Sequence, residues 1–395
     1  MTWEEALRSP RLRRWRWPAV GVAAVLLVGI AIVLSQQEPS GTLAIGPTVA
    51  PEPEDQDETL PAIDPANFVP ERLHPLETTS RQAANGPLLP DAPEVTVVTT
   101  DEQELRAIDI ATGDIITRRV AATAPTFGID PWTLFMAGGR AISNDGNNVV
   151  QLHDGLERTR IARRHHALHT ADDASVWVLN NRMPRSAMTA LRLRFDGTVV
   201  DRVDLPPVAV PHIGTADGVL VSSPGGIHIA SGNGIRQITE SGQFITASTD
   251  RLAWLDCAAD LSCEIVAGTF DDPDQLRLPV DRAEMPGYHG PVVLGFSQDG
   301  RWLALPMFRV AASGIVVEAA VVIIDTAAGA VVDRIEARGS AGYQGIPLAW
   351  SPDGRWLFLA LNGGVNAWNA DTGELTELEL DNRFRRAAGL TVVEH

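Results

Sequence analysis

The fold is decided by residues 345–380, which read G-I-P-L-A-W-S-P-D-G-R-W-L-F-L-A-L-N-G-G-V-N-A-W-N-A-D-T-G-E-L-T-E-L-E-L. In this stretch, four short apolar runs are separated by three turn signals, Ser-Pro-Asp-Gly, Asn-Gly-Gly and Ala-Asp-Thr-Gly. Runs of this length, bounded by Asp-Gly and Asn-Gly pairs, are typical of four antiparallel strands. One such sheet cannot bury both of its faces, so it needs further copies to stack against.

The rest of the chain contains such copies. Residues 296–303 (F-S-Q-D-G-R-W-L) repeat residues 350–357 (W-S-P-D-G-R-W-L), and the turn at 368–373 recurs at 324–329 and at 108–113. With weaker copies, the units begin near residues 95, 125, 165, 210, 245, 291 and 346. Seven units in the last 301 residues have a mean length of about 43, which is typical of a β-propeller with four strands in each blade. We therefore predict an all-β, seven-bladed β-propeller over residues 95–395, with six or eight blades as the alternatives.

The two ends of this region predict how the ring closes. Residues 95–121 offer three strands, so the first unit lacks its innermost strand. The chain ends in a spare strand, G-L-T-V-V-E at 389–394, which has no unit of its own. We expect this strand to complete the first blade, because closing the ring removes the exposed sheet edges.

The repeats resemble two known families. The W-S-P-D-G-R-W-L and F-S-Q-D-G-R-W-L stretches are similar to the repeats of TolB-type propellers, and the Trp/Ile-Asp/Asn-x-x-x-Gly turns are similar to those of WD-repeat propellers. The resemblance covers residues 95–395, clearly in three units and loosely in four. It implies a propeller with a binding surface. The motif residues it brings are structural, since the Asp-Gly forms the turn and the Trp packs between blades.

The N-terminal region predicts a membrane anchor. Residues 17–37 are uncharged and mostly apolar, which is enough to cross a bilayer as one helix. Residues 1–16 carry five arginines against two glutamates, so we expect this basic tail to be cytoplasmic and the rest of the chain to be extracytoplasmic. The alternative is a cleaved signal peptide, against which Val33-Leu34-Ser35 makes a poor cleavage site.

Residues 38–94 predict a linker. Residues 36–94 hold eleven prolines and eleven acidic residues against two arginines, and such a chain cannot bury enough apolar surface to fold. We interpret it as a stalk, with an acidic binding tail as the alternative and with part of 66–90 docking on the propeller through its few apolar residues.

Composition limits the partners. The net charge of −18 argues against nucleic acid, because nothing would neutralise the phosphates. All 32 basic residues are arginine. The lack of lysine, together with the richness in Ala, Val, Gly and Arg, is typical of a G+C-rich genome such as that of an actinobacterium.

Cys257 and Cys263 are the two cysteines of the chain. Outside the membrane such a pair is expected to be oxidised, and here it would clamp one hairpin between a second and a third strand. Five intervening residues make a redox-active pair the weaker interpretation.

Histidines supply the densest group of metal-ligand types. His165 and His169 would share one side of an inner strand, but adjacent Arg163 and Arg164 repel a cation, so we predict no metal and no cofactor. Residues 270–274 (F-D-D-P-D) lack the spacing of a calcium loop. No G-x-S-x-G, H-E-x-x-H or phosphate-binding loop is present in the sequence, and the sialidase turn S-x-D-x-G-x-T-W does not match either.

Two insertions point to a binding face. Compared with the last unit, the sixth has ten extra residues within 307–321, and the third is lengthened over 180–186. Both insertions join second to third strands, whose turns share one face of a propeller. Met, aromatic and Arg residues are enriched at interfaces. The binding candidates are therefore Met307, Phe308, Arg309, Arg182, Met183 and Arg185; neutral loop variation is the alternative.

The leading function is thus a membrane-anchored, extracytoplasmic propeller that binds an envelope protein or a cell-wall component and is not an enzyme. The rival is a hydrolase or lyase acting on glycans or peptides from the central channel. A third interpretation is a structural part of an envelope complex. Fold alone decides between none of these.

Overall fold

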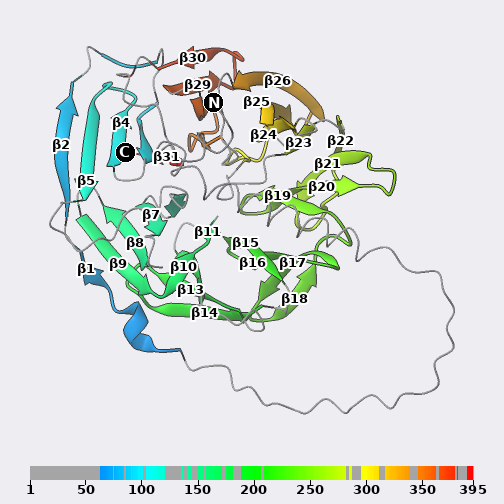
Figure 1. Ribbon diagram of the computed structural model, residues 1–395, viewed down its shortest axis with the longest axis horizontal. Helices are drawn as coiled ribbons and strands as arrows, with labels where there is room; N and C mark the ends of the chain where they lie inside the picture. Colours follow the sequence, from blue (N-terminus) through cyan, green and yellow to red (C-terminus); the bar gives the residue numbers. More distant parts are fainter. Residues whose placement is uncertain are drawn as a thin grey trace, which may run out of the picture. The chain divides into compact units, whose positions relative to one another are not determined.

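The computed structural model describes residues 63–395, apart from 74, 84–85, 90, 92, 101–103, 121–134, 138–139, 145–148, 155–156, 171–174, 181–187, 206–208, 282–283, 287–294, 311–315, 338–345, 362–363, 379, 381–388 and 395. Within them the strands form seven sheets of four or five strands, which are arranged as the blades of a ring (Figure 1). The predicted seven-bladed propeller is confirmed. Among the described residues no helix is long and apolar enough to cross a membrane, and the predicted span at 17–37 lies outside them.

Each blade has four antiparallel strands. The strands are given from the inside outward. Blade 1 has β31 (Gly389–Glu394), β3 (Val95–Thr100), β4 (Glu104–Asp109) and β5 (Ile115–Val120), and blade 2 has β6 (Phe135–Ala137), β7 (Arg140–Asn144), β8 (Val149–Asp154) and β9 (Glu157–Arg163). Blade 3 has β10 (His165–Ala167), β12 (Ser175–Asn180), β13 (Thr189–Arg194) and β14 (Val199–Asp204), and blade 4 has β15 (Val210–Thr215), β16 (Gly218–Ser223), β17 (Gly226–Ser231) and β18 (Gly234–Gln237). A two-residue strand, β11 (His169–Thr170), pairs in parallel with β15.

Blades 5 to 7 follow the same order. Blade 5 has β19 (Gln243–Ala247), β20 (Arg251–Cys257), β21 (Cys263–Thr269) and β22 (Leu276–Val280). Blade 6 has β23 (Glu284–Pro286), β24 (Trp302–Val310), β25 (Val316–Asp325) and β26 (Ala330–Ala337). Blade 7 has β27 (Leu348–Trp350), β28 (Trp356–Leu361), β29 (Gly364–Asn369) and β30 (Leu375–Glu377).

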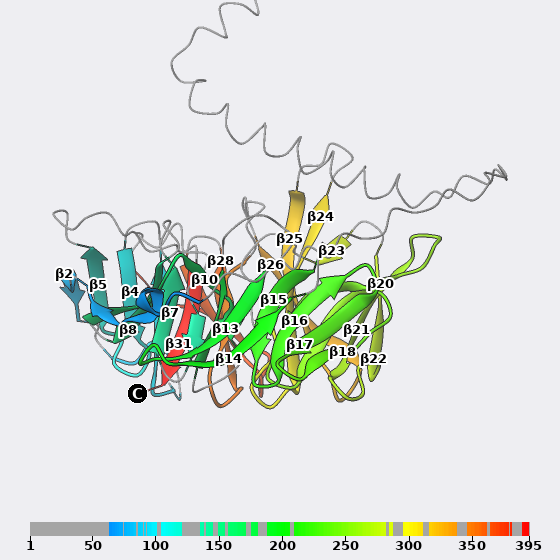
Figure 2. The same ribbon diagram turned by 90° about the horizontal axis from the view of Figure 1, so that it is seen from below.

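This alternation of strand direction sorts the connections between two faces. The turns from second to third strand and the links from one blade to the next lie on the face that points up in Figure 2, which we call the upper face. The turns from first to second and from third to fourth strand lie on the lower face. The recurring turn geometry is on the lower face: in both blades 6 and 7, a Ser-x-Asp-Gly turn places its glycine at positive φ, Gly300 at 69° and Gly354 at 70°.

Two devices close the ring. As predicted, the C-terminal strand β31 completes blade 1 by pairing with β3 from Val95↔Glu394 to Thr100↔Gly389. The second device lies in the range predicted as a linker. There, β1 (Glu71–Arg72) pairs with β9 as an outer fifth strand of blade 2, and β2 (Leu76–Gln82) pairs with β5 as an outer fifth strand of blade 1.

The expected docking of part of 66–90 is thus observed: residues 65–82, which we call the strap, belong to the propeller, so the linker is shorter than 38–94. Ahead of β1, the short 3-10 helix η2 (Pro65–Phe68) buries Phe68 in the core shared by blades 2 and 3. Gly197 allows this contact, because a Cβ there would lie 2.0 Å from the carbonyl oxygen of Phe68. Composition concealed β2 within this strap because the strand buries one side chain, Leu76, and is held by backbone hydrogen bonds.

The core consists of apolar layers between neighbouring blades. Between blades 6 and 7, Trp368 packs edge-on against Trp302 and Trp350, with ring centroids 5.7 and 6.2 Å away. The indole nitrogen Nε1 of Trp368 donates to Asp333 Oδ2 at 2.7 Å, and that of Trp350 donates to the carbonyl of Gly295 at 2.9 Å. The motif tryptophans thus stack the blades and satisfy their polar atoms, as the resemblance implied.

Candidate functional site on the upper face

The upper face has two prominent hairpins, which come from adjacent blades. Strands β24 and β25 of blade 6 have nine and ten residues and rise beyond the neighbouring strands (Figure 2). Strands β20 and β21 of blade 5 have seven residues each and end in a turn clamped by a disulfide. Because a rigid ring holds both hairpins, their paired strands keep a fixed orientation.

The β24–β25 hairpin corrects one prediction. The described residues of the insertion at 307–321 lengthen two paired strands, and Met307 and Phe308 lie inside β24 with only 4% and 7% exposure. Met307 packs in the core between blades 5 and 6, and Phe308 packs in the core between blades 6 and 7. They are therefore part of the fold and are not available to a partner.

Arg309 is held in an ion-pair lattice. Its guanidinium contacts Glu284 at 3.3 Å and Glu318 at 3.0 Å. Glu284, whose side chain is 12% exposed, also accepts two hydrogen bonds from Arg334, at 2.8 and 3.1 Å. These bonds from Arg334 to Glu284 raise the pKa of the Arg334 guanidinium above its usual value. The lattice ties β23, β24 and β26 together, so it stiffens the hairpin from its flanks.

The β20–β21 hairpin is clamped covalently. Cys257 and Cys263 face each other across the two strands and form the predicted disulfide. Beyond it, Asp260 Oδ1 accepts hydrogen bonds from the Ser262 amide at 2.9 Å and the Ser262 hydroxyl at 2.6 Å. The amide of Leu261 donates to the carbonyl of Ala258 at 2.9 Å, which fixes the turn.

The turn between the two cysteines exposes Leu261 to solvent. It adopts a φ of 66°, a left-handed conformation that is uncommon for leucine, and its side chain is 73% exposed. The structure thus holds a large apolar side chain in water on a turn that is fixed by a disulfide and three hydrogen bonds.

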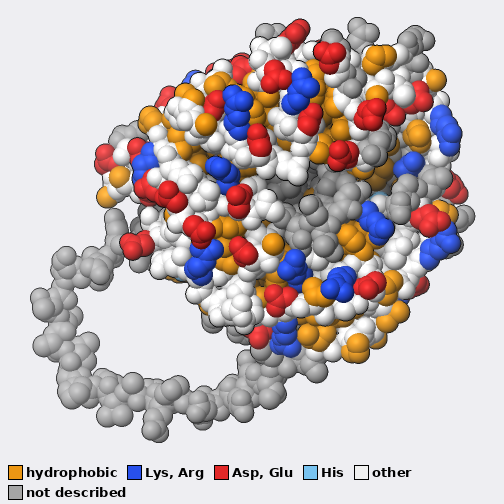
Figure 3. Space-filling view, turned by 180° about the vertical axis from the view of Figure 1, so that it is seen from behind, with side chains coloured by type: hydrophobic (Ala, Val, Ile, Leu, Met, Phe, Trp, Pro, Cys, Tyr) orange, Lys and Arg blue, Asp and Glu red, His pale blue; other side chains and the backbone are white. Residues whose placement is uncertain are grey.

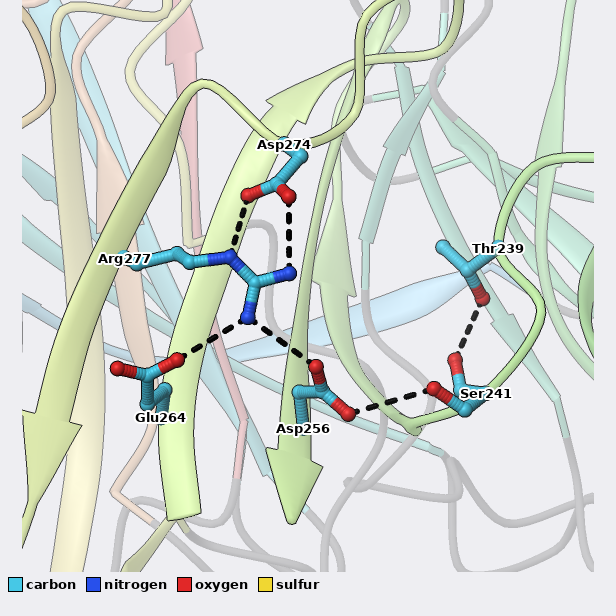
Figure 4. Close-up of polar contacts among 6 residues, drawn as sticks. All are labelled: Thr239, Ser241, Asp256, Glu264, Asp274 and Arg277. Atoms are coloured by element: carbon cyan, nitrogen blue, oxygen red, sulfur yellow. Dashed lines mark hydrogen bonds and ion pairs between the residues drawn. The ribbon is translucent and has the colours of Figure 1, made fainter. Parts of the chain in front are cut away.

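An ion-pair cluster lies below this tip, on the side facing blade 4 (Figure 4). Arg277 contacts three carboxylates: Asp274 at 2.7 Å, Glu264 at 3.0 Å and Asp256 at 3.2 Å. Hydrogen bonds to Asp274, Glu264 and Asp256, in that order, raise the pKa of the guanidinium. The Ser241 hydroxyl, from the link between blades 4 and 5, donates to Asp256 at 3.3 Å. With three carboxylates around one cation, the surface below the tip is acidic.

A third feature lies at the upper end of blade 4. The Ser222 Oγ on β16 lies 2.6 Å from His212 Nε2 on β15, and the adjacent Ser223 Oγ lies 2.9 Å from His228 Nε2 on β17. The imidazole of His212 stacks on Phe244 of blade 5, with ring centroids 4.3 Å apart. Burial lowers the pKa of His212 to about 4, so the ring is neutral at neutral pH. No short motif marked these residues, because they meet across strands.

The remaining predicted residues lie elsewhere. Arg182, Met183 and Arg185 fall outside the described residues. His165 and His169 do not share a strand: β10 pairs within blade 3, whereas β11 pairs with blade 4. The buried His165 ring packs 4.8 Å from the Phe68 ring, so it supports the strap. Within the described part of the chain, no group of three or more His, Cys, Asp or Glu is placed to hold a metal ion.

The lower face lacks a comparable feature in the part that is described. Acidic and basic side chains alternate over it without a continuous field of either sign (Figure 3). Many of them are turn residues, such as Asp299, whose carboxylate accepts a hydrogen bond from the Ser297 hydroxyl at 2.6 Å. This face is therefore built from structural turns.

Comparisons with known proteins find distant likenesses. No protein-family model and no curated protein matches the chain. Among solved structures, the chain is similar to apo AztD from Citrobacter koseri, with 12% identity over 76% of this chain and 97% of that chain and a TM-score of 0.45. It is also similar to a putative TolB from Agrobacterium tumefaciens (14% identity, 54% and 79% covered, TM-score 0.33) and to the dihydro-heme d1 dehydrogenase NirN (14%, 84% and 81%, TM-score 0.37). Likenesses this distant say nothing of function, so the site has to be argued from its own geometry.

Proposed function

We propose that the chain is a membrane-anchored, extracytoplasmic propeller whose upper face binds an envelope protein. The observation that carries this proposal is the disulfide-clamped turn that holds Leu261 73% exposed. A side chain fixed in this way loses little conformational entropy on binding, so its apolar contact contributes fully to affinity.

The chemistry of the partner follows from the surroundings of Leu261. Asp260 is next to it, and Asp256 and Glu264 lie just below the disulfide. Arg277 neutralises only part of that charge. The partner surface that fits is an apolar pocket with basic residues at its rim. Electrostatic complementarity of this kind mainly speeds association and selects the partner.

The proposed location rests on two sequence features and the disulfide. A structural disulfide persists in oxidising compartments, which fits a propeller outside the cytoplasm. Residues 17–37 have the length and apolarity of an anchor, and the arginine-rich residues before them favour a cytoplasmic N-terminus. Deleting residues 1–37 should release the protein from membranes that are washed with alkaline carbonate, whereas the full chain should stay with them. A full chain that washes off would contradict the anchor.

The binding face is tested by crosslinking in place. The full-length chain is made with a photoreactive amino acid at position 261 or, as a matched control, at position 235. Ile235 is also an exposed apolar residue (56%), but it lies on the outer strand β18. Irradiation of intact cells should give a discrete protein adduct from position 261 and none from position 235. The same adduct from both positions, or none from position 261, would exclude this face as the site.

A further inference from the structure

We propose that Ser222 is a nucleophile activated by His212, which makes the upper inner end of blade 4 an ester-hydrolysing site. The Ser222 Oγ and the His212 Nε2 are 2.6 Å apart, within the range of a serine–base pair. Both side chains are half-buried, and Val210, directly across from Ser222 on β15, is 55% exposed. The pair therefore lies next to open surface. This site is independent of the binding surface at Leu261.

The backbone directs His212 toward Ser222. The register of β15 against β16 shifts between Pro211↔Val221 and Ile213↔Leu220, so His212 is the extra residue of a bulge. Bulges redirect single side chains and are common beside active sites. Phe244 then fixes the plane of the imidazole by stacking on it at 4.3 Å and 16°. The bulge and the stack together supply the orientation that a base needs.

The described part of the chain contains two further Ser–His pairs, and their surroundings give them other roles. Ser143 and His153 are 2.7 Å apart, but both are buried, at 0% and 5% exposure, and out of reach of a substrate. The Ser223 hydroxyl accepts a hydrogen bond from the Gly225 amide at 3.2 Å, so it holds the turn between β16 and β17. Ser222 combines a short contact to histidine with an accessible position.

The chemistry is an ordinary acyl transfer. Ser222 Oγ attacks the carbonyl carbon of the ester, and its proton passes to His212 Nε2. The C–O bond to the alcohol then breaks, and the leaving alkoxide takes the proton from His212. Water attacks the acyl-serine with His212 as the base, which releases the carboxylic acid and restores the Ser222 hydroxyl.

The surroundings of His212 also indicate the substrate class. The ring is held by an aromatic stack, and its burial favours the neutral form, so it is a weak base. A weak base can assist the loss of a good leaving group but not of an amine. The substrates that fit are therefore esters with acidic alcohols, such as aryl esters, and not peptides.

The experiment uses the folded full-length protein and a fluorophosphonate probe, which forms an Oγ–P bond with an activated serine and releases fluoride. Wild type and the matched control Ser223→Ala should be labelled at Ser222, as mapped by mass spectrometry, and Ser222→Ala should not be labelled. His212→Gln should slow both labelling and hydrolysis of 4-nitrophenyl acetate by about 100-fold or more, the usual contribution of a general base. Thermal unfolding shows whether each variant is folded. Folded wild type that stays unlabelled, or label on a different serine, would overturn the proposal.

Discussion

The β24–β25 and β20–β21 hairpins rise from the same face of neighbouring blades, but they are held in different ways. In the first, the side chains of Met307 and Phe308 enter the cores on either side of blade 6, and Glu284 ties the flanks together. In the second, a disulfide and turn hydrogen bonds hold the end while Leu261 remains in water. The described side chains of the first hairpin therefore serve stability, whereas the second hairpin holds an apolar side chain in water at its turn.

This contrast shows what an insertion in a repeat can mean. In blade 6, the described residues of the insertion extend an existing sheet, where β26 continues to pair with β25 up to Ala319↔Ala337. The five residues between Cys257 and Cys263 form a turn that carries its own constraints. The length of an insertion is thus a poor guide to binding. What matters is whether the added side chains can find a core.

The largest expected effect is that of Phe308→Ala. Removing a buried phenylalanine from the core between blades 6 and 7 should lower the free energy of unfolding by about 3–5 kcal/mol. The matched control, Leu261→Ala, should change it by less than about 0.5 kcal/mol, because the side chain is exposed. Denaturant unfolding of both variants measures this. Equal losses would mean that the two hairpins do not differ as described.

Removing the disulfide should have the next largest effect. Replacing both Cys257 and Cys263 by serine should lower the free energy of unfolding by about 2 kcal/mol, the value that chain entropy gives for so short a loop. The protein should remain folded, but binding of its partner should weaken because the turn is no longer fixed. If binding is unchanged in the folded double variant, a fixed turn is not required.

Between pH 6.5 and 5, acid should act on the buried histidines of blades 2 and 4, His153 and His212, and on neither hairpin. Burial, and then the charges of Arg158 and Arg118, lower the pKa of His153 to about 3, against about 6.5 in the unfolded chain. The folded state therefore binds fewer protons, so this contribution is complete above pH 6.5 and declines as the pH falls toward 3. Between pH 6.5 and 5 the loss should be about 2 kcal/mol.

Chemical denaturation at the two pH values checks this: His153→Gln should lose about half of the slope, because His212, whose pKa is lowered to about 4 by burial, contributes a similar share. The difference in free energy of unfolding between wild type and the double serine variant should be the same at both pH values. A difference that changes with pH would place a titrating group at the β20–β21 hairpin instead.

The smallest effect should come from the ion-pair lattice. Glu284→Gln leaves Arg309 and Arg334 without their shared carboxylate and should lower the free energy of unfolding by about 1 kcal/mol, because both guanidinium groups are 35–38% exposed. Glu318→Gln, a matched change at a carboxylate with 51% exposure, should have about half that effect or less. The ordering of the two, measured at low salt, tests whether Glu284 is the centre of the lattice.

The fold could be predicted from the sequence because its turns repeat. The Ser-x-Asp-Gly turn needs glycine at positive φ, as Gly300 and Gly354 show, and this requirement leaves a visible pattern. The spare strand at 389–394 was likewise visible as a strand without a unit. Docking of part of 66–90 was visible in apolar residues such as Phe68, but β2 was not, because it is held by backbone hydrogen bonds, which any sequence can make.

The site could be predicted only in part. The disulfide followed from two cysteines in a hairpin, but the importance of Leu261 depends on its exposure, which no local pattern encodes. Met307 and Phe308 have the residue types of an interface, and the same types also form cores. Ser222 and His212 are ten residues apart and meet because a bulge turns one toward the other. Both the exposure of Leu261 and the contact between Ser222 and His212 depend on the assembled ring, and a local sequence pattern does not contain them.

The central claim is that Leu261 anchors a partner, and an affinity measurement tests it most directly. The protein crosslinked from position 261 is purified, and its Kd is measured for wild type, Leu261→Asp and the control Ile235→Asp. The account predicts that Leu261→Asp weakens binding by about 30-fold or more, the effect of losing an interface hot spot, and that Ile235→Asp changes it by less than about twofold. Equal affinity of folded Leu261→Asp and wild type would contradict it.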